Sequence, residues 1–282
     1  MRKLVIGDIH GMYDRLQEVL DKASFSDSDT LYSVGDFCDR GIQNLKTLEF
    51  LMSLDNFKPV IGNHDWWLYL WLVQVFDPDR YYPDEIESIQ CWKNWNGGKN
   101  TYEELNHASR AFLKKLYKWM KSIPFARKVD NKVIIHSIAP DKEYAWRNQE
   151  NWKDYTTVTL ENLQKSGLMY DIVYDSNLWN RNVIVACKDY QQIGYKFPSF
   201  QLWAKDLYSK EFTGDPVYII GHTPLDHPFF DKDLGIVGLD TGAFCDKKLG
   251  WDVEGCLTIL DIDTFEYWQS GKEGVQILKD KE

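Results

Sequence analysis

The sequence is organised around the stretch Gly35-Asp36-Phe37-Cys38-Asp39-Arg40-Gly41, which places two carboxylates and a guanidinium between two glycines. Residues 30–34 before it have strand-like composition, and helical spacing of apolar residues begins at Ile42. The stretch is therefore predicted to be a loop between a strand and a helix, where several side chains can point at one place. Such carboxylates can hold a divalent cation, and an adjacent arginine can grip a phosphate. A solvated surface loop is the alternative interpretation.

The same order of strand, polar loop and helix occurs two more times near the start of the chain. Residues 3–6, a predicted short buried strand, run into Gly7-Asp8-Ile9-His10-Gly11, and residues 57–61 precede Gly62-Asn63-His64-Asp65. Repetition of this unit is typical of α/β folds, in which functional groups gather at the carboxyl ends of strands.

The second half of the chain is mostly β in character. Strands are predicted at 132–135, 217–220 and 236–239, and residues 256–268 indicate a closing hairpin. Together with the α/β first part, this pattern predicts two packed sheets. Residues 77–109 interrupt the pattern with prolines, glycines and aromatic residues, and we interpret them as an insertion packed on the core, with Trp92 and Trp95 as a candidate aromatic lid over the site.

Composition excludes several classes of protein. The chain has 282 residues, enough for one large domain or two small ones, and its net charge of −10 argues against a binder of nucleic-acid backbones. Its 5 cysteines lack CxxC spacing, which favours reduced thiols in a cytoplasmic protein. The most apolar run, residues 66–76, is too short to span a bilayer, and no signal peptide is visible, so no membrane partner is expected.

Four of the 6 histidines lie at the ends of predicted strands, beside Gly, Asp or Asn: His10, His64, His136 and His222. With the nearby Asp and Asn side chains they offer a mixed set of oxygen and nitrogen ligands. Such a set suits Mn, Fe, Zn, Co or Ni better than Ca or Mg. A carboxylate with histidines on both sides suggests two metal ions, which together can activate a water for in-line attack on phosphorus.

The three loops resemble, in the same order, the three motifs of the PPP-type metallophosphoesterases, in particular the bacterial and phage-type serine/threonine protein phosphatases, which are related to symmetrical diadenosine tetraphosphatases. Two later segments, Gly221-His222-Thr223-Pro224 and Asp240-Thr241-Gly242, are similar to the end of the family's site. Leu178-Trp179-Asn180-Arg181 is similar to the segment that carries a further arginine. The resemblance implies one domain over residues 1–282, with the insertion at about 77–109. It also implies a two-sheet β-sandwich flanked by helices, with the active site at the carboxyl ends of the strands.

The resemblance also assigns metal ligands. Asp8, His10 and Asp36 would hold one divalent ion, and Asp36, Asn63, His136 and His222 would hold a second, with Asp36 bridging the two. Manganese is the expected metal, with Fe, Zn, Co or Ni as alternatives. Asp240 is expected to support the site through hydrogen bonds and not to bind metal.

Four residues receive catalytic roles from the same resemblance. His64 would protonate the leaving alcohol and Asp39 would orient it, while Arg40 and Arg181 would clamp the phosphoryl oxygens. The alternative for Arg181 is an ion-paired surface residue.

Three functional hypotheses follow. The leading one is a metal-dependent phosphatase that hydrolyses phosphoserine or phosphothreonine in proteins through a hydroxide bridging two metal ions. The second is a hydrolase of dinucleoside polyphosphates such as diadenosine tetraphosphate, a branch that typically lacks the Asp matching Asp39. The third is a phosphate-binding scaffold without catalysis. A phosphorylated protein or small phosphoester is thus the expected partner, and the sequence leaves the oligomeric state and the redox role of Cys38 open.

Overall fold

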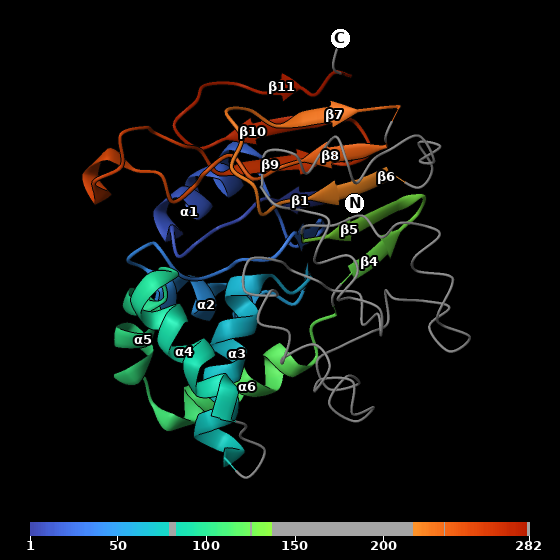
Figure 1. Ribbon diagram of the computed structural model, residues 1–282. Helices are drawn as coiled ribbons and strands as arrows, with labels where there is room; N and C mark the ends of the chain where they lie inside the picture. The colour runs from blue at the N-terminus through green and yellow to red at the C-terminus, as the bar shows by residue number, and fades with distance from the viewer. Residues whose placement is uncertain (79–82, 125, 137–216, 234, 281–282) are drawn as a thin grey trace.

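The computed structural model describes residues 1–78, 83–124, 126–136, 217–233 and 235–280. Their strands form a six-stranded sheet with the order β11-β10-β9-β1-β2-β3 and a five-stranded sheet with the order β4-β5-β6-β8-β7. The two sheets stack in the upper half of Figure 1, and helices α2 to α6 lie below them. This is the predicted α/β architecture of two sheets with flanking helices.

The first sheet comprises β1 (Lys3–Ile6), β2 (Thr30–Ser33), β3 (Phe57–Pro59), β9 (Thr258–Asp261), β10 (Glu266–Gln269) and β11 (Gln276–Ile277). The second comprises β4 (Ala126–Val129), β5 (Lys132–Ile135), β6 (Val217–Ile220), β7 (Phe229–Asp231) and β8 (Ile236–Gly238). The described helices are α1 (Tyr13–Lys22), α2 (Asn44–Ser53), α3 (Asn63–Phe76), α4 (Pro83–Trp95), α5 (Lys99–Asn106), α6 (Arg110–Lys121) and the short 3-10 helix Lys247–Leu249.

Parallel pairing aligns the ends of six strands. In the first sheet β1, β2 and β3 run parallel, and in the second β5, β6 and β8 do the same. The carboxyl ends of three strands from each sheet therefore lie along one edge of the sandwich. All the loops singled out in the sequence within the described residues begin at this edge.

Alternating side chains of β1 explain why the sheets pack as they do. Val5 belongs to an apolar cluster that lies between the two sheets, whereas Leu4 and Ile6 belong to the larger cluster that includes the helices. Both faces of this strand are buried, as expected of a central strand between parallel and antiparallel neighbours. The predicted hairpin of β9 and β10 completes the same sheet beside β1.

The insertion at 77–109 is more regular than the sequence predicted. Where prolines and glycines suggested irregular chain, the structure has α4 and α5, separated by a turn that contains Gly97 and Gly98. The two glycines end one helix and start the next, so they mark a helix–turn–helix unit. The predicted lid of Trp92 and Trp95 is not what the structure shows. Trp92 is fully buried and so cannot cover the site from outside, whereas Trp95 is 83% exposed.

Several predictions fall outside the described residues or stay untested. Arg181 and its segment lie in 137–216. The prediction of one domain over residues 1–282 therefore stays a prediction. Among the described residues no helix has the length and apolarity needed to cross a membrane. Cysteines 38, 91, 245 and 256 are free thiols, and Cys187 lies outside the described part.

Candidate metal centre and active site

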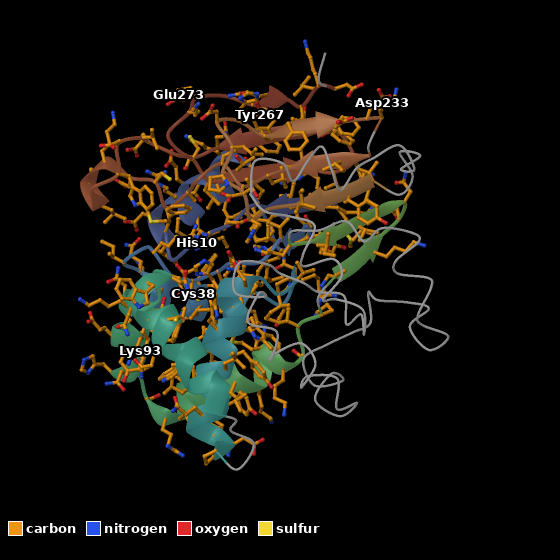
Figure 2. The ribbon with its side chains drawn as sticks, in the orientation of Figure 1. His10, Cys38, Lys93, Asp233, Tyr267 and Glu273 are labelled. Atoms are coloured by element: carbon orange, nitrogen blue, oxygen red, sulfur yellow. The ribbon has the colours of Figure 1, made fainter. Side chains whose placement is uncertain are left out.

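The site forms where the loops after β1, β2 and β3 meet the loops after β5, β6 and β8, between the sheets and the helices (Figure 2). The first two loops are tied by their backbones: the N–H groups of Ile9 and His10 both donate to the carbonyl of Asp36, at 3.0 and 2.9 Å. The third loop is held by Asp65, whose carboxylate accepts the N–H groups of Asp36 and Gly62 at 2.7 and 2.8 Å. A single buried carboxylate thus fixes the second loop to the start of α3.

Five predicted site residues adopt left-handed backbone conformations that are unusual for residues with a side chain. They are His10, Asp36, Asp39, Arg40 and His222, with φ values of 49°, 53°, 76°, 64° and 74°. Such conformations cost on the order of 1 kcal/mol or more each and persist only where surrounding contacts impose them. Their concentration here indicates that the fold aims these side chains for a function.

Two histidines direct unprotonated ring nitrogens toward Asp36. Nδ1–H of His10 donates to the carbonyl of Cys38 at 2.9 Å, and Nδ1–H of His136 donates to that of Val34 at 2.6 Å. In each ring the lone pair is therefore on Nε2, which lies 3.6 Å (His10) or 3.5 Å (His136) from the same oxygen, Asp36 Oδ2. Burial lowers the pKa of both imidazoles, which keeps them neutral, the form that binds metal.

Asn63, His136 and His222 form a compact ligand set. Asn63 Oδ1, His136 Nε2 and His222 Nδ1 are each 3.2 Å from the other two. Atoms bound at about 2.1 Å to one tetrahedral or octahedral ion lie about 3.0–3.4 Å apart. The triangle therefore fits one cation, and Asp36 lies close enough to His136 and His222 to join it.

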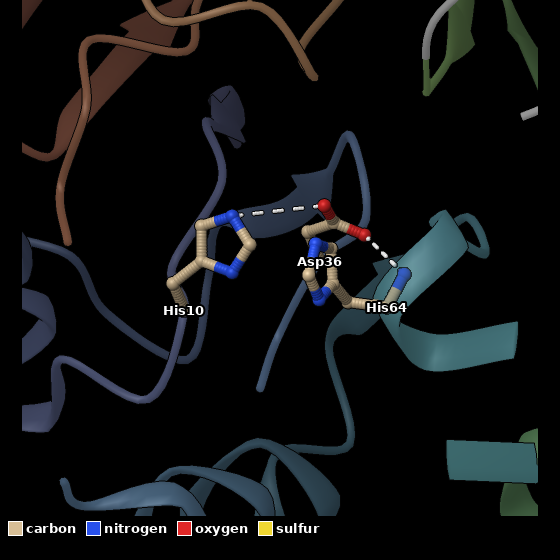
Figure 3. Close-up of side chains that lie close together, drawn as sticks. All are labelled: His10, Asp36 and His64. Atoms are coloured by element: carbon tan, nitrogen blue, oxygen red, sulfur yellow. Dashed lines mark hydrogen bonds and ion pairs between the residues drawn. The ribbon is translucent and has the colours of Figure 1, made fainter. Parts of the chain in front are cut away.

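Asp36 also borders a second group. His10, Asp36 and His64 have potential ligand atoms within 4.8 Å of one another. Figure 3 shows Asp36 between the two histidines, with one oxygen facing His10 and the other accepting the backbone N–H of His64 at 3.0 Å. Asp36 therefore belongs to both groups, but this second group contains His64 where the predicted ligand set has Asp8.

Asp8 lies beside both groups but belongs to neither. Its Oδ2 accepts the backbone N–H of His222 at 2.9 Å, and within the described part of the chain its buried Oδ1 has no hydrogen-bond partner. Burial and the neighbouring carboxylates of Asp240 and Asp36 raise its pKa. A buried, under-partnered cluster of carboxylates calls for positive charge, so the residues present fit a divalent cation.

Asp240 accepts the N–H of Gly242 through Oδ1 at 2.9 Å, and its Oδ2 is buried with no hydrogen-bond partner among the described residues. It lies outside both ligand groups, as Asp8 does, and its supporting role stays a prediction.

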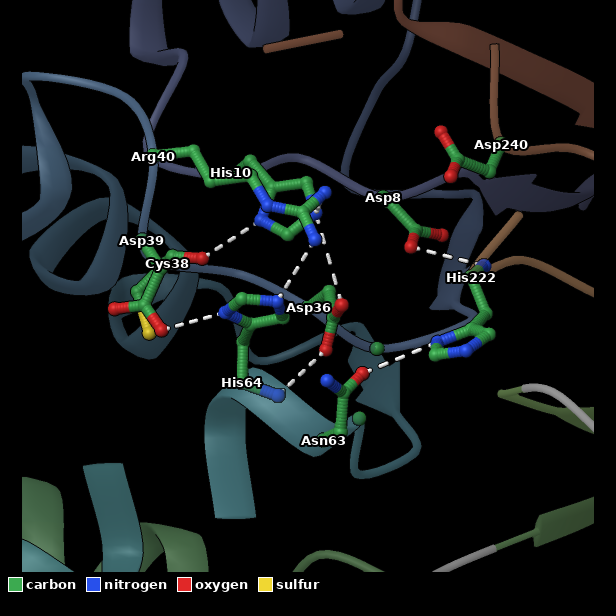
Figure 4. A network of polar contacts seen from close by, with 12 residues as sticks. Asp8, His10, Asp36, Cys38, Asp39, Arg40, Asn63, His64, His222 and Asp240 are labelled. Carbon is green, nitrogen blue, oxygen red and sulfur yellow. Dashed lines mark hydrogen bonds and ion pairs between the residues drawn. The ribbon is translucent and has the colours of Figure 1, made fainter. Parts of the chain in front are cut away.

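His64, Asp39 and Arg40 form a chain of contacts beside the ligand groups (Figure 4). Nδ1–H of His64 donates to Asp39 Oδ2 at 2.7 Å, and its Nε2 accepts from the Arg40 guanidinium at 3.1 Å. The other terminal nitrogen of Arg40 donates to His10 Nε2 at 3.1 Å, and the guanidinium lies over the ring of Phe244. His64 thus has one nitrogen fixed by a carboxylate and the other facing the ligand groups.

The pKa values of Asp39 and His64 are shifted in opposite directions. Burial raises the pKa of Asp39 to about 7, although hydrogen bonds from Thr101 and Trp92 oppose the rise. Burial and the positive charge of Arg40 lower the pKa of His64. The charged forms of both groups therefore depend on each other and on where the Arg40 guanidinium lies.

Sequence reasoning missed the residues that hold this pair. Trp92 Nε1–H donates to Asp39 Oδ2 at 2.5 Å, and the Thr101 hydroxyl donates to Asp39 Oδ1 at 2.6 Å. The signal in the sequence was the pair Gly97-Gly98 before α5. A Cβ on residue 98 would lie 2.2 Å from the Trp92 indole nitrogen, so glycine is needed there for Trp92 to pack as it does. The pair was interpreted only as a break in the pattern.

Comparison with known proteins identifies the family. The model of the calcineurin-like phosphoesterases matches residues 1–166, more than half of the chain. The chain belongs to the calcineurin-like phosphoesterase family. The resemblance found in the three loops is thereby confirmed.

Individual relatives of this phosphoesterase carry two kinds of name. Serine/threonine-protein phosphatase 2 of Salmonella typhimurium is 28% identical over 88% of this chain and 90% of its own length. The symmetrical bis(5'-nucleosyl)-tetraphosphatase of Buchnera aphidicola is 48% identical over 23% of this chain and 24% of its own length. The chain thus spans about a quarter of the length of that relative.

Solved structures support the same fold. The cold-active protein-tyrosine phosphatase of a psychrophilic Shewanella species superimposes with a TM-score of 0.55 and 15% identity, over 99% of this chain and 80% of the other. At this identity the likeness concerns the two-sheet architecture and not the substrate.

Proposed function

We propose that this phosphoesterase is a metal-dependent hydrolase of phosphomonoesters, with phosphoserine and phosphothreonine in proteins as its substrates. The observation that carries the proposal is the His64–Asp39 pair: Nδ1–H of the imidazole donates to a fully buried carboxylate at 2.7 Å, while Nε2 faces the ligand groups. This is the arrangement of a general acid, because the carboxylate fixes the ring and stabilises its protonated form.

The residues that would hold metal are those assigned from the sequence. Asn63, His136 and His222 with Asp36 would hold one divalent ion, and Asp8 and His10 with Asp36 the other. Loaded two-ion sites of this kind supply an activated water and neutralise phosphoryl charge. We propose manganese as the cellular metal, since the oxygen and nitrogen ligands suit a borderline divalent ion.

Arg40 would bind the phosphoryl group. Its guanidinium lies against the Nε2 atoms of His10 and His64, at the border of the ligand groups, and its planar fork suits two phosphoryl oxygens. When the guanidinium turns to an anionic phosphoryl group, His64 loses a hydrogen-bond donor and a positive neighbour. Nε2 can then carry the proton that the leaving oxygen needs. Arg181 is proposed as a second phosphate ligand on the sequence resemblance alone.

The leaving group distinguishes the two candidate substrates. A serine or threonine alkoxide is a poor leaving group that must be protonated as the ester bond breaks, whereas a nucleotide leaves as a stabilised phosphate anion. The Asp39–His64 pair serves the first reaction. The second candidate, hydrolysis of diadenosine tetraphosphate, is favoured by the 48% identity to a symmetrical tetraphosphatase over 67 residues.

Initial rates on the two substrates test the proposal. Manganese-loaded protein is given a phosphothreonine peptide or diadenosine tetraphosphate, with chelator-treated protein as the control. Faster metal-dependent hydrolysis of the peptide supports the phosphatase. Faster hydrolysis of the dinucleotide would replace it by the second candidate, and turnover of neither would refute both.

A further inference from the structure

The helices of the insertion hold the loop that carries Asp39. Three polar residues on one side of α5 contact this loop: Asn100 donates to the carbonyl of Gly41 at 3.1 Å, Thr101 contacts Asp39, and Glu104 accepts the N–H of Leu45 at 2.8 Å. The N–H of Arg40 donates to the carbonyl of Gly97 at 2.9 Å. The segment 97–104 therefore holds residues 39–45, which are the end of the loop after β2 and the start of α2.

Both oxygens of the Asp39 carboxylate accept a hydrogen bond from a residue of the insertion. Oδ1 accepts from the Thr101 hydroxyl, and Oδ2 accepts from the Trp92 indole N–H as well as from His64. The Thr101 oxygen also accepts the Asp39 backbone N–H at 3.0 Å, so one hydroxyl fixes both the backbone and the side chain of Asp39. All four side chains are nearly or fully buried, at 0–2% exposure.

These contacts determine where the His64 ring points. A carboxylate can rotate about its own axis, and each rotation moves the oxygen that accepts from His64 Nδ1. With Thr101 on one oxygen and Trp92 on the other, rotation would break one buried hydrogen bond, which is costly away from water. The orientation of Asp39, and through it that of His64, is therefore fixed by the insertion.

We propose that Trp92 and Thr101 are positioning residues for the general acid, and that the insertion aligns His64 with the leaving oxygen of the substrate. The proposal rests on the proposed function. It assigns to the insertion a role in proton transfer to poor leaving groups, where the sequence suggested a lid.

The test compares two leaving groups in three variants. Trp92→Phe removes the indole N–H, Thr101→Val removes the hydroxyl, and Thr101→Ser restores it. The controls are Trp268→Phe in β10 and Thr47→Val in α2, whose hydroxyl donates to the carbonyl of Gln43 just before that helix. Each protein is loaded with manganese, and kcat and KM are measured on a phosphothreonine peptide and on p-nitrophenyl phosphate.

The expected result is selective loss. Trp92→Phe and Thr101→Val should lower kcat on the peptide by about 10- to 100-fold, the range of one hydrogen bond to a charged group, with KM unchanged. The loss on the aryl phosphate should be at most a few-fold, because its leaving group needs little protonation. Thr101→Ser should recover most of the activity, and the controls should match wild type. In a His64→Ala background, neither Trp92→Phe nor Thr101→Val should lower kcat further.

Equal losses on both substrates, or additive losses on top of His64→Ala, would overturn the proposal. A second readout does not depend on turnover. In zinc-loaded protein, the Nδ1 proton of His64 should give a low-field proton resonance that is absent in His64→Ala. It should shift or exchange away in Trp92→Phe and Thr101→Val, and an unchanged signal would overturn the proposal. If wild-type protein hydrolyses neither substrate, the proposed function fails, and this resonance alone decides the positioning role.

Discussion

Asp39→Asn offers the sharpest test of the acid assigned to His64, because it removes the charge of the partner and keeps its shape. The amide oxygen can still accept from His64 and Trp92, and the amide N–H group can donate to the Thr101 hydroxyl. What is lost is the attraction between the carboxylate and the protonated ring. Two unit charges about 4 Å apart interact by about 4 kcal/mol at an effective dielectric constant near 20, and general-acid catalysis contributes about 10²–10⁴-fold in all. We therefore expect kcat on a phosphothreonine peptide to fall about 10²–10³-fold.

Although its activity should fall, Asp39→Asn should be at least as stable as wild type. Burial raises the pKa of Asp39 to about 7 from an ordinary value of 3.8. A carboxyl group whose folded pKa is raised costs stability increasingly as the pH rises from about 4 to about 7, and the full cost remains above that. Three pKa units correspond to about 4 kcal/mol as an upper bound. Asp39→Asn relieves this cost, so its melting temperature near neutral pH should be equal to or above that of wild type.

The assay measures kcat on the peptide and on p-nitrophenyl phosphate in the same preparation, together with thermal unfolding by circular dichroism. Asp261→Asn is the matched control, since Asp261 is also buried, at 3% exposure, but accepts the backbone N–H groups of its own turn. Loss of activity on the peptide alone, in a protein that is no less stable, is the expected result. Equal losses on both substrates would refute the assignment of His64 as the acid.

Three further predictions concern other parts of the molecule. His64→Ala should lower turnover of alkyl phosphates by about 10²–10⁴-fold and of aryl phosphates by less, as measured by steady-state kinetics; an equal or larger loss on the aryl ester would contradict it. Asp36→Asn should abolish both activities and weaken manganese binding in calorimetry, because Asp36 Oδ2 faces His10 and His136. Asp29→Asn should lower the free energy of unfolding by about 1–2 kcal/mol near pH 7, because its carboxylate pairs with Arg2 at 2.7 Å and its pKa is lowered to about 2. That stability is present above about pH 4 and lost as the pH falls toward 2, so urea midpoints of wild type and variant should converge over this range.

The ligand groups could be predicted from the sequence because they belong to short loops after strands. Asp8, Asp36 and Asn63 follow β1, β2 and β3, which pair in parallel, and their carboxyl ends must meet at one edge. The strand-like composition of residues 3–6, 30–34 and 57–61 predicted the strands, and the glycine-bounded loops marked where the strands end. What the sequence could not supply is atomic detail, such as the use of Nδ1 by His222 where His136 uses Nε2.

The supporting residues were harder to predict because their partners are distant in the chain. Trp92 and Thr101 lie 53 and 62 residues from Asp39, and no local pattern relates a helix to a loop over that distance. Asp65 is an intermediate case. Its hydrogen bond to Gly62 is the local one expected of an acid in the first turn of a helix, whereas its bond to Asp36 crosses between loops.

The backbone of the second loop explains why the site needs these distant supports. Asp39 and Arg40 both have left-handed φ angles, which cost on the order of 1–3 kcal/mol each for residues with side chains. A free loop would relax out of this conformation and turn both side chains away from His64. Asp39 is held by the Asn44 and Thr101 oxygens on its backbone N–H, and Arg40 by the Gly97 carbonyl. The contacts of the insertion therefore offset the strain of the loop, because α5 and the turn before it maintain a backbone conformation that the loop alone would not keep.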